Sequence, residues 1–367
     1  MNLIRYIKNI TEFSIFFFLK LILPKVKIQN NSLLLVNTGL MGDLIVSSIL
    51  LENSKVFNKF KKVHFLIKEQ YLELFADYSG EIKIIGYNYE NYRTSFLSKY
   101  RKLIELRNEG YEICINLTAA RGILNEEMTH LVGAKETITL NTFLKYLGKG
   151  IGNYFNNKYS NIIAKNILNE YDKHFELLKY LSGNNNFYFN KGVVFPDYNI
   201  DTTKFNELKN TVIIAPFSSV MTRDWESDKF AGLINRLKIK NKIVLLGSKN
   251  QFDKLLKISN YDENITILAG ELRLNELAIL INKAKLFIGL DSGLTHIALK
   301  MNTPLIAIIG GGEFGRFFPY RESKNAKYLY SKMDCFLCHW ECSKERKFCI
   351  TDVTLNDVLK EIDKMLE

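Results

Sequence analysis

The chain has 367 residues, of which 47% are hydrophobic and 24% are charged. These proportions are typical of a folded globular protein and exclude a disordered or fibrous chain. The length exceeds that of one ordinary compact core, so we expect two domains. The formal net charge of +11 predicts a surface that attracts polyanions, namely nucleic acid, anionic lipid headgroups, or phosphorylated sugars and nucleotides.

Residues 1–30 form an apolar and basic segment. Its run of Phe, Ile and Leu at 11–24 contains Lys20 and is shorter than the roughly 20 residues of a membrane-spanning helix. Two interpretations remain open: a membrane-surface anchor that can be removed without unfolding the rest, or a helix packed on its own domain. The flanking basic residues, which fit an interfacial helix, are Arg5, Lys8, Lys20, Lys25 and Lys27.

From residue 32 onward, short apolar runs alternate with longer helical stretches, which predicts an α/β fold with parallel sheets. A polar, Asn-rich stretch at 182–190 is the expected linker, after which the alternation restarts. We therefore predict two successive Rossmann-like domains at 31–190 and 191–367. The predicted strands are 33–37, 62–67, 82–85, 113–117, 212–215, 243–246, 265–268, 286–289 and 305–309, and a helix is predicted over 43–52.

The turn Gly39-Leu-Met-Gly42-Asp43 follows the first predicted strand. Gly39 and Gly42 allow the backbone to turn tightly and to approach a ligand at the carboxyl edge of the sheet. There Asp43 would accept the proton of a sugar hydroxyl; the alternative is that Asp43 only caps the following helix. The spacing is neither the G-x-G-x-x-G of dinucleotide-binding folds nor a Walker loop, which disfavours an NAD-binding oxidoreductase.

Two further polar clusters follow predicted strands. One lies on the loop after strand 212–215, where hydroxyls and an arginine are suited to phosphate oxygens; an incidental arginine on an exposed loop is the alternative. The other follows strand 286–289, where a helix N-terminus offers backbone N–H groups to a diphosphate; a capped helix with an incidental histidine is the alternative. The first cluster contains Ser218, Ser219 and Arg223, and the second contains Asp291, Ser292, Gly293, Thr295 and His296.

Four of the five cysteines stand close together, at Cys335, Cys338, Cys342 and Cys349. This clustering is unlike a disulfide framework and indicates a reducing compartment, the cytoplasm. Four thiolates at this spacing predict a structural zinc or iron site, and free thiols are the alternative.

Five ordered motifs together resemble glycosyltransferase family 9, the heptosyltransferases. The resemblance is strong in the second half of the chain and weak between residues 67 and 211. It implies a GT-B architecture, in which two Rossmann-like domains face a central cleft, with the acceptor at 31–190 and the nucleotide-sugar donor at 191–367. The motifs are the turn 39–43, the loop 218–225, the segment 268–277, the turn 291–296 and the tail 310–320.

The resemblance implies an inverting heptosyltransferase that needs no catalytic metal or other cofactor. The donor would be ADP-heptose and the acceptor a lipid-linked or core oligosaccharide of lipopolysaccharide. Asp43 matches the family's general base, Arg223, Ser218 and Ser219 match positions beside the diphosphate, and Asp291 and His296 match positions near the heptose and the diphosphate. One departure is the sequence at 247–251, where many relatives carry an acidic residue that holds the ribose.

The remaining alternative is a metal-stapled module without enzymatic activity that binds nucleic acid. It is disfavoured because the basic residues are scattered rather than gathered in a stripe with aromatic residues, so we expect no nucleic-acid partner. The basic N-terminal segment and a lipid-linked acceptor instead predict a peripheral enzyme, bound to the anionic inner face of the cytoplasmic membrane.

Overall fold

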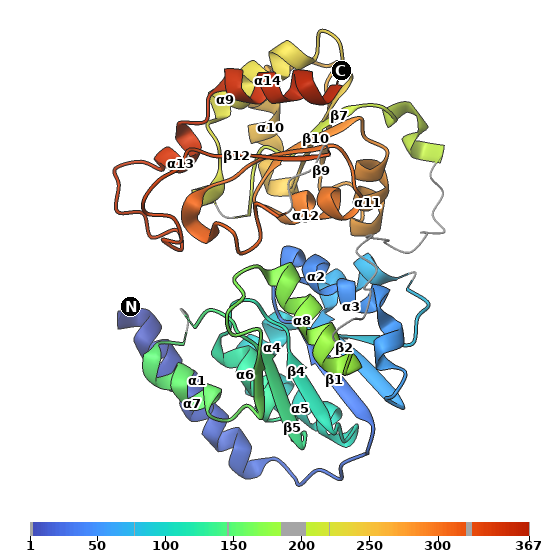
Figure 1. Ribbon diagram of the computed structural model, residues 1–367, viewed down its shortest axis with the longest axis vertical. Coiled ribbons are helices and arrows are strands. Elements are labelled where there is room, and N and C mark those ends of the chain that lie inside the picture. Colours follow the sequence, from blue (N-terminus) through green and yellow to red (C-terminus); the bar gives the residue numbers. More distant parts are fainter. Residues whose placement is uncertain are drawn as a thin grey trace. The chain divides into compact units, whose positions relative to one another are not determined.

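The computed structural model describes residues 3–76, 78–144, 147–184, 203–219, 221–320 and 325–366. The chain divides into two compact units, Met1–Lys191 and Gly192–Glu367 (Figure 1). Most of the predicted linker at 182–190 lies outside the described residues.

The first unit is built on a parallel sheet with the strand order β3-β2-β1-β4-β5-β6. All five residues of β1 are buried, because helices cover both faces of the sheet. The strands are β1 (Ser32–Val36), β2 (Lys62–Lys68), β3 (Lys83–Tyr87), β4 (Ile113–Asn116), β5 (Glu136–Leu140) and β6 (Asn161–Ile163). The helices are α1 (Leu3–Ile22), α2 (Met41–Ser47), α3 (Ile49–Glu52), α4 (Tyr89–Thr94), α5 (Phe96–Asn108), α6 (Ile123–His130), α7 (Lys149–Asn156) and α8 (Glu170–Ser182).

The second unit repeats this topology in a parallel sheet with the order β12-β11-β10-β7-β8-β9. Counted within each unit, both sheets have the order 3-2-1-4-5-6 of doubly wound Rossmann folds. The strands are β7 (Val212–Ile214), β8 (Ile243–Gly247), β9 (Thr266–Ala269), β10 (Leu286–Leu290), β11 (Leu305–Ile308) and β12 (Ala326–Leu329). The helices are α9 (Ser227–Leu237), α10 (Phe252–Ile258), α11 (Leu274–Asn282), α12 (Gly293–Lys300), α13 (Phe348–Thr351) and α14 (Leu355–Leu366).

In both sheets the strand order reverses between the first and the fourth strand of the unit. These positions are the β1–β4 pair and the β7–β10 pair. The connections that leave such a pair run to opposite faces, which opens a crevice at the carboxyl ends of the strands. A ligand site in either unit is therefore expected after β1 and β4, or after β7 and β10.

The structure confirms the predicted strands within about two residues and adds β5, β6 and β12. The predicted helix over 43–52 is divided into α2 and α3 at Ser48. The Ser48 hydroxyl donates to the carbonyl of Ile45 at 2.8 Å, a local bond that competes with a continuous helix.

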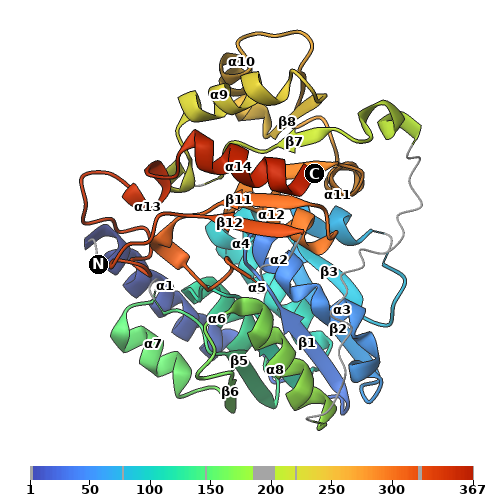
Figure 2. The same cartoon turned by 45° about the horizontal axis from the view of Figure 1, so that its top comes forward.

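Helix α1 contributes one face to the core of the first unit. Phe16 and Leu19 are 2% and 0% exposed and belong to its main apolar cluster. The ring of Phe16 lies 5.2 Å from that of Phe155 in α7, and Figures 1 and 2 show α1 beside α7. Residues of α1 are thus part of the domain, as the second interpretation of this segment expected. Within the described residues, no helix is both long and apolar enough to cross a bilayer.

Candidate functional site

The predicted site residues of the first unit lie at its topological switch point. Thr38, after β1, and Thr118, after β4, are joined by a bond from the Thr38 N–H to the Thr118 hydroxyl at 3.1 Å. Asn37 fixes the turn from within, because its Oδ1 accepts the Gly39 N–H at 2.8 Å and its Nδ2 donates to the Ser47 hydroxyl at 2.8 Å. The glycine turn is therefore a fixed structure.

Asp43 lies in the first turn of α2, half-buried. Its Oδ2 accepts the backbone N–H of Leu40, the N-cap residue, at 2.8 Å, so Asp43 stabilises the helix start from the third helical position and not as the N-cap itself. A Cβ built on Gly39 would lie 2.4 Å from the same oxygen. Position 39 must therefore be glycine for the carboxylate to take this place.

Lys68 is a charged neighbour of Asp43 that sequence reasoning missed. It ends β2, is buried, and holds its Nζ 4.2 Å from the ring centroid of Tyr89. Burial lowers the pKa of the Lys68 amine, and the charges of Asp43 and Glu90 act against that shift. The signal in the sequence was a lysine directly after the apolar run 65–67 that ends the predicted strand.

In the second unit the structure brings Arg223 and Asp291 together at the carboxyl ends of β7 and β10. Arg223 Nη1 lies 3.3 Å from Asp291 Oδ1 and 3.2 Å from its backbone oxygen. Burial raises the pKa of the Asp291 carboxyl, Arg223 opposes the shift, and Glu313 adds to it. The site thus pairs a buried carboxyl with a partly exposed guanidinium.

The turn into α12 is compact. The Ser292 and Thr295 hydroxyls lie 3.3 Å apart, and Thr295 Oγ1 donates to the carbonyl of Leu290. A Cβ on Gly289 would lie 2.8 Å from that Oγ1, so glycine at this position allows the close approach. Gly293, also predicted, is the first residue of α12.

His296 is buried in α12, with its ring 5.5 Å from that of Phe317 and 4.4 Å from that of Phe318. Burial, assisted by the charge of Arg223, lowers the pKa of His296 to about 3. The imidazole is therefore neutral at pH 7.

Ser218 and Ser219 differ in their surroundings. Ser218 is buried, and its backbone N–H donates to Asp224 Oδ1 at 2.8 Å. Ser219 is exposed at the described end of the loop. Asp224 holds the shape of this loop, and burial raises the pKa of its carboxyl against the effect of the Ser218 hydrogen bonds.

Glu313 and Arg316, from the tail after β11, join the predicted cluster. Arg316 Nη1 lies 2.5 Å from Glu313 Oε2, and the charges of both residues act on Asp291. Sequence reasoning placed Arg316 in a family motif and did not place Glu313 in the site. The available signal was an acidic and a basic residue three positions apart after a strand.

None of the four cysteines at 335–349 is joined in a disulfide bond. Burial raises the pKa of Cys349, and the charges of Cys335, Cys338 and Cys342 add to the shift. Within the described part of the chain, no three His, Cys, Asp or Glu side chains are arranged to hold a metal ion. In this arrangement Cys342 is exposed and its Sγ contacts the carbonyl of Arg346 at 3.8 Å, and the zinc or iron site stays a prediction.

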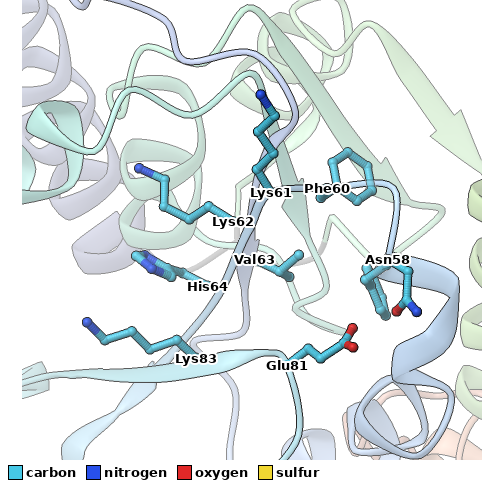
Figure 3. A pocket seen from close by; sticks show the side chains of 9 residues that line it. Asn58, Phe60, Lys61, Lys62, Val63, His64, Glu81 and Lys83 are labelled. Carbon is cyan, nitrogen blue, oxygen red and sulfur yellow. The ribbon is translucent and has the colours of Figure 1, made fainter.

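A pocket of about 500 Å³ lies elsewhere in the first unit, where β2 and β3 begin (Figure 3). Figure 3 shows the Lys62, His64 and Lys83 side chains on one side of the strands. The Lys62 amine is paired with Glu109 at 2.9 Å, and Lys61, Lys83 and Glu81 also line the pocket. The pocket contains none of the predicted site residues and lies at the opposite edge of the sheet from Asp43.

Comparison with known proteins connects this geometry to a family. Residues 189–346 match the family model of glycosyltransferase family 9 (heptosyltransferase). Lipopolysaccharide heptosyltransferase 3 of Escherichia coli K12 is 30% identical over 162 residues, which are 42% of this chain and 46% of the relative. The chain thus matches less than half the length of this curated relative. The resemblance predicted from the motifs is confirmed.

Solved structures share the fold across nearly the whole chain. A family 9 glycosyltransferase from Veillonella parvula has a TM-score of 0.67 and 16% identity, covering 93% of this chain and 99% of the other. The Escherichia coli heptosyltransferase WaaC with ADP-2-deoxy-2-fluoro heptose has a TM-score of 0.63 and 15% identity, covering 91% and 99%. At these identities the likeness shows the fold alone, and it confirms the predicted GT-B architecture of two Rossmann-like domains.

Proposed function

We propose that this protein is an inverting glycosyltransferase. The premise is that residues 189–346 match glycosyltransferase family 9. The observation that carries the proposal is the position of two sets of polar residues. Asp43 follows the first strand of one Rossmann-like sheet, and Arg223 and Asp291 follow the reversing strands of the other. Both are places where doubly wound sheets bind ligands.

In the proposed reaction, Asp43 accepts the proton of an acceptor hydroxyl. The hydroxyl oxygen attacks the anomeric carbon of the donor sugar from the face opposite the diphosphate. The new glycosidic bond forms as the bond to the diphosphate oxygen breaks, which inverts the configuration at that carbon. Leu40, whose N–H binds Asp43 Oδ2, fixes the carboxylate in place.

The departing diphosphate takes the negative charge, and we assign its stabilisation to Arg223, the Ser218–Ser219 loop and the start of α12 near Ser292. Asp291 orients Arg223, because its backbone oxygen accepts a hydrogen bond from Nη1 at 3.2 Å and its Oδ1 forms an ion pair with Nη1 at 3.3 Å. Neutral His296 offers a hydrogen bond without adding charge. In this proposal protein groups compensate the charge of the leaving group, and we expect no catalytic cofactor.

The proposed donor is ADP-heptose, and the proposed acceptor is a lipopolysaccharide core oligosaccharide. Support for the donor comes from WaaC, which was solved with an ADP-heptose analogue, and support for the acceptor comes from the name of the Escherichia coli relative. The segment after β8 lacks the acidic residue found in many relatives. Here Gln251 Nε2 instead donates to the carbonyl of Ser218 at 3.4 Å, within the predicted donor loop.

We also propose that the enzyme works at the inner face of the cytoplasmic membrane, bound through α1. The helix has a second apolar face, spaced by three and four residues, that points away from its core. This face continues onto the start of α5, where the Phe96 ring lies 5.8 Å from that of Phe18. Its exposed members are Ile7, Ile10, Phe17, Phe18, Leu21, Ile22, Phe96 and Leu97.

Basic side chains surround this apolar face. Lys20, Lys25 and Arg101 are exposed, whereas Glu12 is paired with Lys8 at 3.7 Å. An apolar face with a basic border fits the interface of an anionic bilayer, where each Lys or Arg contributes about 1 kcal/mol.

The test of the proposed reaction is a calorimetric screen with ADP-, UDP- and GDP-sugars, followed by measurement of nucleotide release with a core oligosaccharide. We expect ADP-heptose to bind and to release ADP only with the acceptor, also in the presence of EDTA.

Arg223→Ala should weaken donor binding by about 1.5–3 kcal/mol, the loss of a charged hydrogen bond. Arg236→Ala, an exposed arginine on α9, is the matched control. Binding of UDP- or GDP-sugars alone would contradict the assigned donor, and unchanged affinity in Arg223→Ala would move the diphosphate elsewhere.

A further inference from the structure

The loop that carries the four cysteines, residues 335–349, packs on the glycine turn that follows β11. The N–H of Leu337 donates to the carbonyl of Gly311 at 2.7 Å. A Cβ built on Gly310 or on Gly312 would lie 2.7 Å or 2.3 Å from the indole of Trp340. The glycines at 310 and 312 therefore make the space that the Trp340 ring fills.

The backbone holds Trp340 in an uncommon conformation. Its φ is +64°, and that of the neighbouring His339 is +53°, a region that bulky L residues rarely adopt. The His339 N–H donates to the carbonyl of Gly312 at 2.8 Å, and His339 Nδ1 lies 3.1 Å from Glu313 Oε1. Such a backbone persists only where its surroundings determine it, so the position of the indole is specified by the fold.

The Trp340 ring meets the predicted diphosphate residue. The guanidinium carbon of Arg223 lies 5.4 Å from the ring centroid, the geometry of a cation–π contact. The same guanidinium reaches Asp291 through Nη1. Trp340 is therefore a direct neighbour of the Arg223–Asp291 pair.

Three buried polar atoms at this place have no hydrogen-bond partner among the described residues. They are Trp340 Nε1, Arg223 Nε and Thr222 Oγ1. Buried donors are nearly always paired in folded proteins. The indole and Nε groups can only donate, so the missing partner must accept hydrogen bonds. Beside a guanidinium, the acceptor that fits is an anion with several oxygens, such as a phosphate.

We infer that Trp340 is a donor-binding residue, whose indole N–H donates to a phosphate oxygen of the nucleotide-sugar alongside Arg223 Nε. The inference rests on the proposed function, because it assigns a further contact in the same site. It gives the cysteine-bearing loop a role as the element that delivers the indole to the diphosphate.

The experiment titrates ADP and inorganic pyrophosphate into the full chain and two variants by calorimetry. Trp340→Phe keeps an aromatic ring against the glycine turn and removes the N–H, so both ligands should bind roughly tenfold more weakly or worse. The matched control is Trp225→Phe. The Trp225 Nε1 already donates to the carbonyl of Val353 at 2.9 Å in the core, so this variant should melt at a lower temperature and keep its affinity.

Fluorescence provides a second measurement that does not require Trp340→Phe to fold. The chain has two tryptophans, so Trp225→Phe leaves Trp340 as the only one, and its emission should change as either ligand binds. ADP binding with unchanged Trp340 emission and unchanged affinity in Trp340→Phe would overturn the inference alone. If pyrophosphate changes the Trp340 emission but ADP does not bind, the phosphate contact of Trp340 is supported. The same result contradicts a nucleotide-sugar as the donor. If neither ADP nor pyrophosphate binds, both the Trp340 inference and the proposed donor are overturned.

Discussion

We propose two roles for Asp43, one structural and one chemical, and a single substitution separates them. Asparagine keeps an oxygen that accepts the Leu40 N–H, so Asp43→Asn should retain the helix start. The amide accepts no proton, so we expect kcat to fall by roughly 10²–10⁴-fold while donor affinity stays nearly constant. Steady-state kinetics and calorimetry on the same preparation measure both.

Asp43→Ala is the comparison for this prediction. It removes the cap as well as the base, and should lower the free energy of unfolding by about 1 kcal/mol in addition to losing activity. Turnover near the wild-type rate in Asp43→Asn would leave Asp43 as a helix cap and nothing more.

At the scale of the element, α1 divides its apolar residues between two faces. Replacing Phe17 and Leu21, which are 40% and 83% exposed, with serine should reduce co-sedimentation with vesicles and should destabilise the fold less than a substitution in the core, although Phe17 also packs 5.6 Å from Tyr154. Ile239→Ser, at an exposed apolar residue after α9, is the control for lost surface hydrophobicity. Anionic and neutral vesicles in low and high salt separate apolar insertion from charge attraction.

Phe16→Ser tests the opposite face. Phe16 is 2% exposed in the core, so this variant should lose about 3–5 kcal/mol of stability. Equal vesicle binding by the wild type and the Phe17 and Leu21 double variant would show that the outer face of α1 is not the membrane surface.

For the whole molecule, buried His296 links stability to pH. Its folded pKa of about 3 lies below the unfolded value of 6.5, so between these values only the unfolded chain binds the proton. Stability should therefore fall as the pH decreases below 6.5, by ~1.4 kcal/mol per unit, with no contribution above it. Urea unfolding at pH 7.5 and 5.0 measures this slope, and His296→Phe should reduce the loss. An identical loss in both proteins would contradict a buried neutral His296.

The order of apolar and polar residues was sufficient to predict nine of the twelve strands that the structure describes in the two sheets. Runs such as 33–36 are apolar at every position because both faces of a central parallel strand are buried, so they are visible without any partner. The candidate site was visible for a related reason: carboxyl ends of parallel strands meet at one edge, so polar residues after strands converge there. Short strands such as β6 (Asn161–Ile163) carry too few apolar residues to be detected.

Only the tertiary structure could decide what each remaining side chain contacts. Helix α1 carries apolar residues on two faces, and its sequence does not tell which face is buried. The contact with α7 shows that the face with Phe16 and Leu19 belongs to the core. The motif around Asp43 did not reveal Lys68, because the two residues meet through adjacent strands β1 and β2. Trp340 lies far from Arg223 in the chain, and their contact depends on a loop that packs on glycines through space. Such contacts follow from packing between distant segments, which no local pattern of residues records.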